Sequence, residues 1–173
     1  NDEAAARPPL FTPLFFTMCG FSCTVFLSAF LLLPTAPLRI LALGGSSVAA
    51  GAFLGLLTYA SAFTAPLTGA LADRMGRRRR LIVCSLVVSA FAALYGVIGV
   101  PRLMLVLVVV HGVFWSGLLS GSAAYITGVI PESRRAEGIG YWGLSTLLAV
   151  AVAPTVGFWI YSRGWLWVCV LAA

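Results

Sequence analysis

The chain has 173 residues, of which 61% are hydrophobic and only 9% are charged, and its mean hydropathy is +1.03. A soluble domain carries about a quarter charged residues, so this composition excludes a water-soluble fold and makes lipid the solvent for most of the chain. The net charge of +6 arises from eleven arginines without any lysine, and it is compatible with nucleic acid or with anionic lipid as a partner. Because five of the arginines lie between two long apolar runs, within residues 69–80, we expect lipid and no nucleic acid.

Long apolar runs divide the chain into membrane spans. Crossing a hydrocarbon core takes about 20 residues of α-helix. The intervals with this length are 11–33, 46–71, 81–100, 103–130 and 138–161, and a sixth apolar run begins at Trp165. Pro34 and Pro37 are expected to end the first helix. The predicted fold class is an all-α membrane protein, a helical bundle of five complete transmembrane helices plus the start of a sixth.

The predicted organisation is a cytoplasmic N-terminal tail at residues 1–10 and a transmembrane bundle at residues 11–173. Because the connections are short, consecutive helices are predicted to be antiparallel neighbours. Small residues at Gly51 and Gly55, and at Gly117 and Gly121, have the GxxxG spacing that allows helix backbones to approach closely. We expect this packing to occur within the bundle.

Arginine distribution predicts the orientation in the membrane. With the N-terminus inside, eight arginines fall on the cytoplasmic side, and three, Arg39, Arg102 and Arg163, fall outside. Cytoplasmic loops carry the excess of positive residues. The N-terminus and the basic stretch near residue 78 are therefore predicted to be cytoplasmic.

The stretch from residue 69 to residue 80 links the second and third predicted helices. Its pattern, Gly-x-Leu-Ala-Asp-Arg-x-Gly-Arg-Arg, consists of Gly69, Leu71, Ala72, Asp73, Arg74, Gly76, Arg77 and Arg78. In residue types, spacing and position it resembles the signature loop of the major facilitator superfamily of secondary transporters. The resemblance extends over the whole chain, which is similar to the N-terminal six-helix half, truncated in helix six. It implies a C-terminal half, absent from this chain, that rocks against the first half about a central site.

The chemistry of the small and polar residues in this stretch suggests a physical role for several of them. Gly69 leaves room for another helix, Gly76 permits a sharp reversal, and Asp73 can cap a helix N-terminus, where the dipole favours negative charge. The resemblance implies that Gly69, Asp73, Arg74, Gly76, Arg77 and Arg78 form a latch that holds the cytoplasmic side closed by bonding across to the other half. We call these residues the cytoplasmic latch. The alternative is a mere topological anchor, which is what we expect of Arg79 and Arg80.

The loop from Pro131 to Gly138 also resembles a cytoplasmic loop of the family. Arg135 and Glu137 are candidates to extend the charge network of Asp73 and Arg77. Exposed ion pairs contribute only about 0–1 kcal/mol each, so the alternative is a solvated anchor at the membrane surface.

The fifth span contains a partial exporter motif. Residues 149–158 resemble the Gly-x-x-x-Gly-Pro-x-x-Gly-Gly motif of the family's exporters, with alanines at Ala149 and Ala153 and a phenylalanine at Phe158 in place of glycines. Pro154 removes an internal hydrogen bond and is expected to kink the helix. The resemblance favours efflux over uptake.

The fourth span carries a histidine where many exporters of the family have the glutamine of Arg-x-x-Gln-Gly. Here the five residues are Val108-Val109-Val110-His111-Gly112. An ionisable residue inside a membrane is a functional candidate, so His111 is a candidate proton or substrate site. The alternative is a neutral histidine hydrogen-bonded between helices. Because the predicted spans contain no acidic residue, we expect no carboxylate proton carrier in this part of the chain.

Other polar side chains lie near the middle of the spans. In the family, helices one, two, four and five line the central cavity, so the resemblance makes these residues candidate cavity-lining residues: Thr24, Ser28, Tyr59, Trp115, Ser116, Ser145 and Thr146. The alternative is packing with the hydroxyls bonded to backbone carbonyls. With one histidine and without a catalytic triad, paired carboxylates or a phosphate-binding loop, we expect no enzyme, no metal site and no cofactor.

These observations lead to a first hypothesis and to alternatives from other classes. The first is a secondary active transporter of small organic molecules that works by alternating access in a bacterial inner membrane, an exporter, with proton coupling left open. Its partners would be the lipid bilayer and a small-molecule substrate. One alternative is an uptake permease of the same superfamily. Another is a non-transporting fragment or interaction protein that lacks the C-terminal half.

Overall fold

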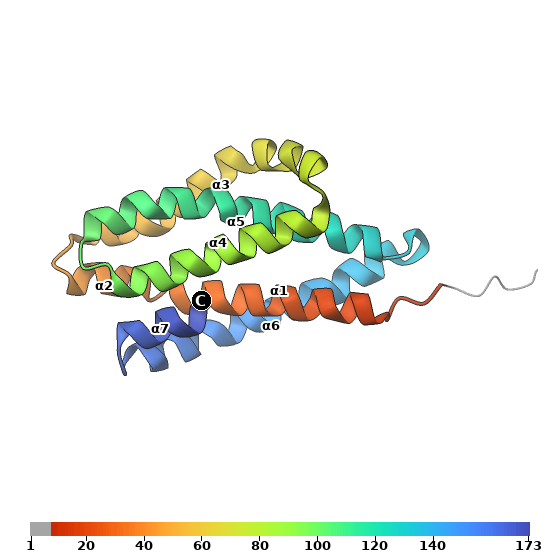
Figure 1. Ribbon diagram of the computed structural model, residues 1–173. Coiled ribbons are helices and arrows are strands. Elements are labelled where there is room, and N and C mark those ends of the chain that lie inside the picture. The colour runs from red at the N-terminus through yellow and green to blue at the C-terminus, as the bar shows by residue number, and fades with distance from the viewer. Residues whose placement is uncertain (1–7) are drawn as a thin grey trace, which may run out of the picture.

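The computed structural model describes residues 8–173, with the side chains of residues 71–75 outside that description. The described chain is a bundle of helices in which consecutive long helices run in opposite directions (Figure 1). The helices are α1 (Pro13–Leu32), α2 (Ala36–Ala42), α3 (Ser47–Met75), α4 (Arg77–Val97), α5 (Pro101–Val129), the 3-10 turn η1 (Glu132–Arg134), α6 (Arg135–Tyr161) and α7 (Trp165–Ala172). The predicted all-α bundle is confirmed.

Local sequence explains where α1 and α3 begin. The Thr12 hydroxyl accepts a hydrogen bond from the Phe15 backbone N–H at 3.2 Å, and Pro13 occupies the first turn of α1. Ser46 caps α3 in the same way, accepting from the Ala49 N–H at 3.1 Å. Serine and threonine are favoured at this position because their oxygens bond amides that have no partner inside the helix. Proline is tolerated in the first turn because its missing N–H would be unpaired there.

The first span differs from its prediction. Pro34 and Pro37 were expected to end it, but after a turn at residues 33–35 the chain continues as α2. Pro37 lies in the first turn of α2, where it is compatible with a helix. The buried Thr35 donates its hydroxyl to the carbonyls of Leu31 and Leu32 at 2.9 and 3.0 Å. Its side chain therefore holds the interruption together, and the first span is a broken helix.

Helix packing does not follow chain order. The most extensive contacts join α3 to α5 and α1 to α6, whereas α3 and α4 touch over a short stretch and α5 barely touches α6. The prediction that consecutive helices are neighbours is therefore correct for α4 with α5, holds for the first and second spans only where α2 contacts α3, and is wrong over most of the length of the other long helices. A short connection holds two helix ends together at one surface, and it leaves the rest of each helix free to pack elsewhere.

Close packing of these helix pairs depends on glycine. An added Cβ at Gly112 of α5 would lie 2.7 Å from the Leu57 carbonyl oxygen of α3, and one at Gly157 of α6 would lie 2.8 Å from the Leu31 carbonyl oxygen of α1. Ala149 and Ala153, on the same side of α6, are buried as well. Small residues let backbones touch, and in lipid such contacts drive helix association.

The two GxxxG pairs behave differently. Gly117 and Gly121 face α4, where added Cβ atoms would lie 3.0 Å from the Cys84 sulfur and 3.0 Å from Leu81 Cδ2. This pair packs within the bundle, as predicted. Gly51 and Gly55 have no atom within 4 Å of an added Cβ. For this pair the prediction of packing within the bundle is wrong for the described residues, because it faces the outer surface of α3.

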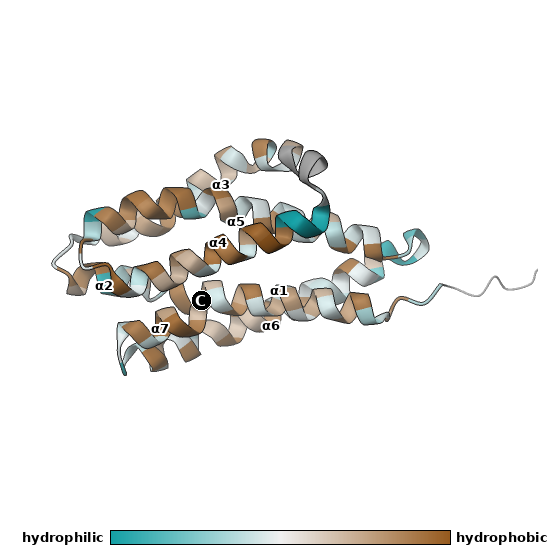
Figure 2. Cartoon of the chain, in the orientation of Figure 1, coloured by the Kyte–Doolittle hydropathy of each residue, from teal (hydrophilic) through white to brown (hydrophobic). Residues whose placement is uncertain are grey.

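The outer surface of the bundle is apolar. Within the described residues, five helical segments are long and apolar enough to cross a membrane, including Pro13–Ala42 as one broken span. Phe63, Val48 and Val97 are each at least 76% exposed. Figure 2 shows hydrophobic residues along the helices and hydrophilic ones at the start of α4 and in the η1 loop. The chain is an integral membrane protein.

Polar connections gather at the two ends of the bundle. The α3–α4 connection, the η1 loop and the start of α1 lie at one end, and the α2–α3, α4–α5 and α6–α7 connections lie at the other (Figure 1). This arrangement puts Arg77–Arg80, Arg134 and Arg135 together at the first end. We refer to it below as the arginine-rich end.

Candidate functional site

The reversal between α3 and α4 is a single residue. α3 ends at Met75 and α4 begins at Arg77, so Gly76 alone connects them. Its backbone angles are φ 77° and ψ 137°, a conformation that side chains disfavour. The sharp reversal expected at Gly76 is therefore present. The side chains of Asp73 and Arg74, which belong to the cytoplasmic latch, lie outside the described residues. An added Cβ at Gly69 would meet no atom within 4 Å, so that position on α3 has space beside it.

The four arginines after Gly76 have different surroundings. The Arg77 guanidinium reaches α5 at Gly128, where an added Cβ would lie 2.5 Å from its Nη1. Arg78 lines a cavity of about 450 Å³ between α1, α4 and α5. Arg79 is exposed, in keeping with a surface anchor, but Arg80 is only 4% exposed. The expectation that Arg80 is a surface anchor is therefore wrong.

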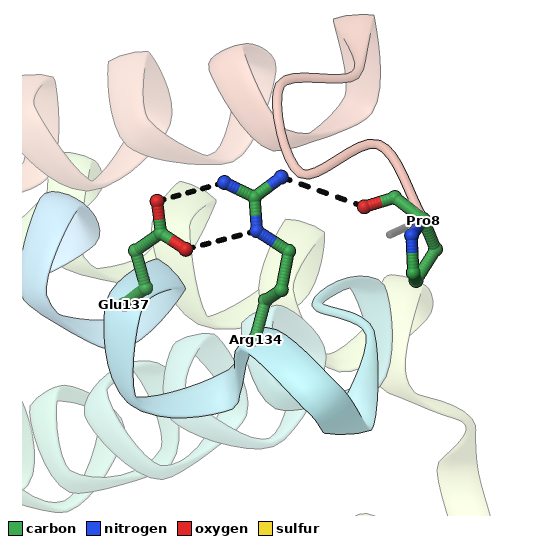
Figure 3. Close-up of polar contacts among 3 residues, drawn as sticks. All are labelled: Pro8, Arg134 and Glu137. Atoms are coloured by element: carbon green, nitrogen blue, oxygen red, sulfur yellow. Dashed lines mark hydrogen bonds and ion pairs between the residues drawn. The ribbon is translucent and has the colours of Figure 1, made fainter. Parts of the chain in front are cut away.

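Ion pairs organise the loop between α5 and α6. Arg134 donates from Nε and Nη2 to the two carboxylate oxygens of Glu137 at 2.8 and 2.7 Å, and its Nη1 donates to the Pro8 carbonyl at 3.4 Å (Figure 3). Arg135 lies 3.6 Å from a carboxylate oxygen of Glu132. The described contacts thus give Arg135 and Glu137 different partners, and a link from either to Asp73 stays a prediction. The contact with Pro8 ties the segment before α1 to this loop.

His111 is buried among aromatic rings. It is 4% exposed, its Nδ1 lies 3.3 Å from the Tyr95 hydroxyl, and the Phe91 ring stacks on it with centroids 5.4 Å apart. The Tyr95 carbonyl in turn accepts a hydrogen bond from the Trp165 indole at 2.8 Å. Through these bonds Tyr95 of α4 connects α5 to α7.

Three of the candidate cavity-lining or proton-site residues meet at one small cavity. Ser28, His111 and Trp115 line a space of about 10 Å³ between α1, α3, α4 and α5. That volume is about the minimum for a single water molecule. The Ser28 hydroxyl donates to the Ala172 carbonyl of α7, and Ser28 also lines a larger cavity of about 220 Å³ together with Thr24.

The remaining candidates are spread over the bundle. Tyr59 is 67% exposed and stacks on Phe63 on the outer face of α3. Ser145 and Thr146 donate their hydroxyls to carbonyls of α6, and Thr24 donates to the carbonyl of Gly20. Ser116 is buried, and its hydroxyl lies 3.1 Å from that of Thr68. These residues do not converge on one cavity, and their role in lining a substrate path stays a prediction.

A row of hydroxyls between α3 and α5 includes the predicted candidate Ser116 and three residues that were not predicted, Thr58, Ser61 and Ser120. A cavity of about 360 Å³ is lined by Thr58 and Ser61 of α3 and by Trp115, Ser116 and Ser120 of α5. The spacing of Ser116 and Ser120, four residues apart and therefore on one helix face, was the available sequence signal. Thr58 and Ser61 share a face in the same way.

Pro154 lies inside α6, which continues from Arg135 to Tyr161. The residue removes one backbone hydrogen bond, while Ala153 beside it is fully buried. The kink expected at Pro154 stays a prediction.

The sequence profile of the Major Facilitator Superfamily matches residues 17–173, nearly the whole described bundle. The chain belongs to this superfamily. Among curated proteins, it is 27% identical over 131 residues to the MFS-type transporter YhjO of Bacillus subtilis, a match that covers 76% of this chain and 33% of YhjO. It is 24% identical over 110 residues to the multidrug export protein EmrB of Haemophilus influenzae, covering 63% of this chain and 22% of EmrB.

A third curated protein that matches the chain is named as an enzyme and not as a transporter. Over 110 residues the chain is 34% identical to a glycogen synthase of Aromatoleum aromaticum, covering 58% of this chain and 22% of that enzyme. The match to the superfamily covers residues 17–173, whereas the match to this enzyme covers 58% of the chain. The chain spans about a third of the length of YhjO and less of EmrB.

Proposed function

We propose that this chain forms part of a secondary active transporter that exports small organic molecules by alternating access. The observation that carries the proposal is the complete signature from Gly69 to Arg78, located at a one-residue reversal between two helices long enough to cross a membrane. In alternating access, two halves rock about a central site. The cytoplasmic latch would hold one of the two states.

We propose that the direction of transport is efflux and that the protein lies in a bacterial inner membrane. The similarity to a protein named as a multidrug exporter supports export, and so does the small-residue face of α6 around Pro154. The arginine-rich end is proposed to be cytoplasmic, with the N-terminus inside, because positive residues accumulate on that side. Asp73 and Arg77 would then act on the cytoplasmic side of the substrate path.

For His111 we propose a neutral, interhelical role in place of proton transfer. Its Nδ1 is bonded to Tyr95, and one of its ring faces is covered by Phe91. The described residues that contact it from α1, α3, α4 and α5 include no charged group, so an imidazolium at this position would have no negative charge beside it. Burying a charge without a partner costs several kcal/mol.

Replacing His111 by glutamine is therefore expected to leave the pH profile of transport unchanged. Stability should fall by about 0.6 kcal/mol, the mean contribution of an interhelical hydrogen bond in a membrane. Tyr95→Phe is the matched control, because it removes the same bond from the other side. A pH optimum that moves in His111→Gln and stays in place in Tyr95→Phe would show that His111 carries the proton.

Ethidium accumulation in cells tests the direction of transport. The protein is produced from its complete reading frame in bacteria that lack their main exporters, and cellular ethidium fluorescence is followed with and without a protonophore. Export predicts several-fold lower ethidium accumulation that the protonophore reverses. Higher accumulation than in control cells would favour an uptake permease, and an unchanged level would contradict ethidium-type efflux.

A further inference from the structure

Arg80 has an unusual environment for an arginine in a membrane protein. It lies in the first turn of α4 and is only 4% exposed. Its Nη1 donates to the backbone carbonyl of Thr68 on α3 at 2.7 Å. Its Nε is buried without a hydrogen-bond partner among the described residues. Arg79, the preceding residue, is exposed.

A glycine on α5 makes room for this side chain. An added Cβ at Gly121 would lie 3.1 Å from both Nε and Nη2 of Arg80. The guanidinium of Arg80 therefore lies on the backbone of α5 at Gly121 and extends beyond it to α3. Thr68, whose carbonyl it reaches, is joined to α5 by the hydroxyl contact with Ser116. Arg80 thus links three helices at the arginine-rich end.

Burying the charged guanidinium of Arg80 costs free energy, which suggests that the buried position serves a function. Charged residues inside membranes are rare, and they are kept where they serve a pathway or a switch. A residue needed only to anchor the loop could stay in water, as Arg79 does. Pro66 lies inside α3 and cannot donate the backbone hydrogen bond that the carbonyl of residue 62 would otherwise accept. Thr68, whose carbonyl Arg80 bonds, lies just beyond the turn that this proline weakens, so Arg80 holds the part of α3 that follows the weak turn.

We propose that Arg80, lying on Gly121, is a positioning residue that holds the end of α3 against α5. That end leads through Gly76 into α4 and carries part of the cytoplasmic latch. Arg80 would act by fixing where this segment lies, without contact with the substrate. The effect of Arg80 on transport rests on the transporter function proposed above. Its positioning of α3 does not, because the positioning can be measured without any substrate.

Backbone hydrogen exchange of the protein from its complete reading frame, purified in lipid nanodiscs, tests the positioning. In Arg80→Gln the amides of residues 67–75 are expected to exchange about tenfold faster, which corresponds to about 1.4 kcal/mol. The first turns of α3, residues 47–60, should be unchanged. Arg80→Lys keeps the positive charge and a nitrogen that can donate to the Thr68 carbonyl, so it should restore much of the protection. Arg79→Gln is the matched control and should match the native protein.

A second variant tests the same role of Arg80 in case Arg80→Gln fails to fold. Gly121→Ala keeps the arginine and crowds its guanidinium, so it should loosen residues 67–75 in the same place and to a smaller extent. If exchange in residues 67–75 is unchanged in both variants, or rises equally throughout α3, α4 and α5, the proposed positioning role is wrong.

Ethidium transport supplies the functional readout. Arg80→Gln should lower the maximal rate severalfold and leave the half-saturating ethidium concentration unchanged, with partial rescue by Arg80→Lys. A change confined to the half-saturating concentration would overturn the positioning role in favour of substrate contact. If the native protein moves no ethidium, the export proposal fails while the hydrogen exchange result still decides the role of Arg80.

Discussion

Replacing Gly157 by alanine is expected to lower the melting temperature of the bundle by about 2–12 °C. An added Cβ would lie 2.8 Å from the Leu31 carbonyl oxygen and 3.2 Å from Leu31 Cα, both of which belong to the backbone of α1. Backbone atoms cannot turn aside as a flexible side chain can, so α1 and α6 would have to separate. Overpacking of this kind costs about 1–3 kcal/mol, and each kcal/mol shifts the midpoint by about 2–4 °C in a chain of this size.

Gly143 provides the control on the same helix. An added Cβ there meets no atom within 4 Å, and alanine is favoured over glycine inside a helix by about 0.5–1 kcal/mol. Gly143→Ala should therefore leave the midpoint unchanged or raise it slightly. Thermal unfolding followed by circular dichroism in detergent compares the two variants. Equal shifts in the same direction would contradict the close contact between α1 and α6.

Replacing Gly76 by alanine is expected to destabilise the protein and to slow transport. The residue has φ 77° and ψ 137°, where a side chain is strained, and a residue forced into such a region costs about 1–3 kcal/mol. Because Gly76 alone connects α3 to α4, the strain can be relieved only by moving a helix end that carries the cytoplasmic latch.

Thermal unfolding and ethidium transport measure both consequences of Gly76→Ala. Gly51→Ala is the matched control, because this glycine lies in α3, has helical surroundings and has no atom within 4 Å of an added Cβ. The control should keep native transport and native or higher stability. If Gly76→Ala retained both properties as well, the reversal would not depend on glycine.

The sequence predicts the spans and the reversal well because both depend on local properties. Apolar length locates the five spans, although α3 continues beyond the predicted span 46–71 as far as Met75 and α4 begins before the predicted span 81–100, at Arg77. Glycine at position 76 agrees with a one-residue connection. The path of the first span was harder to predict. Proline is favoured in the first turn of a helix and is also common just after a helix end. Pro37 lies in the first turn of α2 and does not mark the end of the span.

The sequence alone did not show which residues pack against one another in the folded chain. In the sequence Arg79 and Arg80 look alike, and only the packing of α4 on α5 makes one exposed and the other buried. The glycine pairs 51/55 and 117/121 share one spacing, yet only the second faces a neighbouring helix. Thr24, Ser145 and Thr146 bond to carbonyls of their own helices, an option open to any hydroxyl in a helix. Spacing therefore could not assign them to a cavity.

The apolar side chains on the outer faces of the helices indicate that lipid or further protein surrounds the bundle. Tyr59, Phe63 and Leu67 of α3 are between 67% and 80% exposed, as are Val48 and Val97 to a similar extent. An exposed apolar surface of this kind is stable in a hydrocarbon solvent and unstable in water. The buried polar groups, Arg80, His111 and Ser116 among them, lie between helices instead.

Gradient-driven transport in proteoliposomes tests the central claim most directly. The protein from its complete reading frame is reconstituted, a pH gradient is imposed, and ethidium movement is recorded with and without an ionophore that collapses the gradient. Secondary active export, as proposed, predicts ethidium movement against its own gradient that slows in Asp73→Asn, and loss of this movement on collapse of the pH gradient would identify protons as the driving ions. Ethidium movement only down its own gradient, or no movement at all, would contradict the proposal that this chain forms part of a secondary active exporter of such compounds.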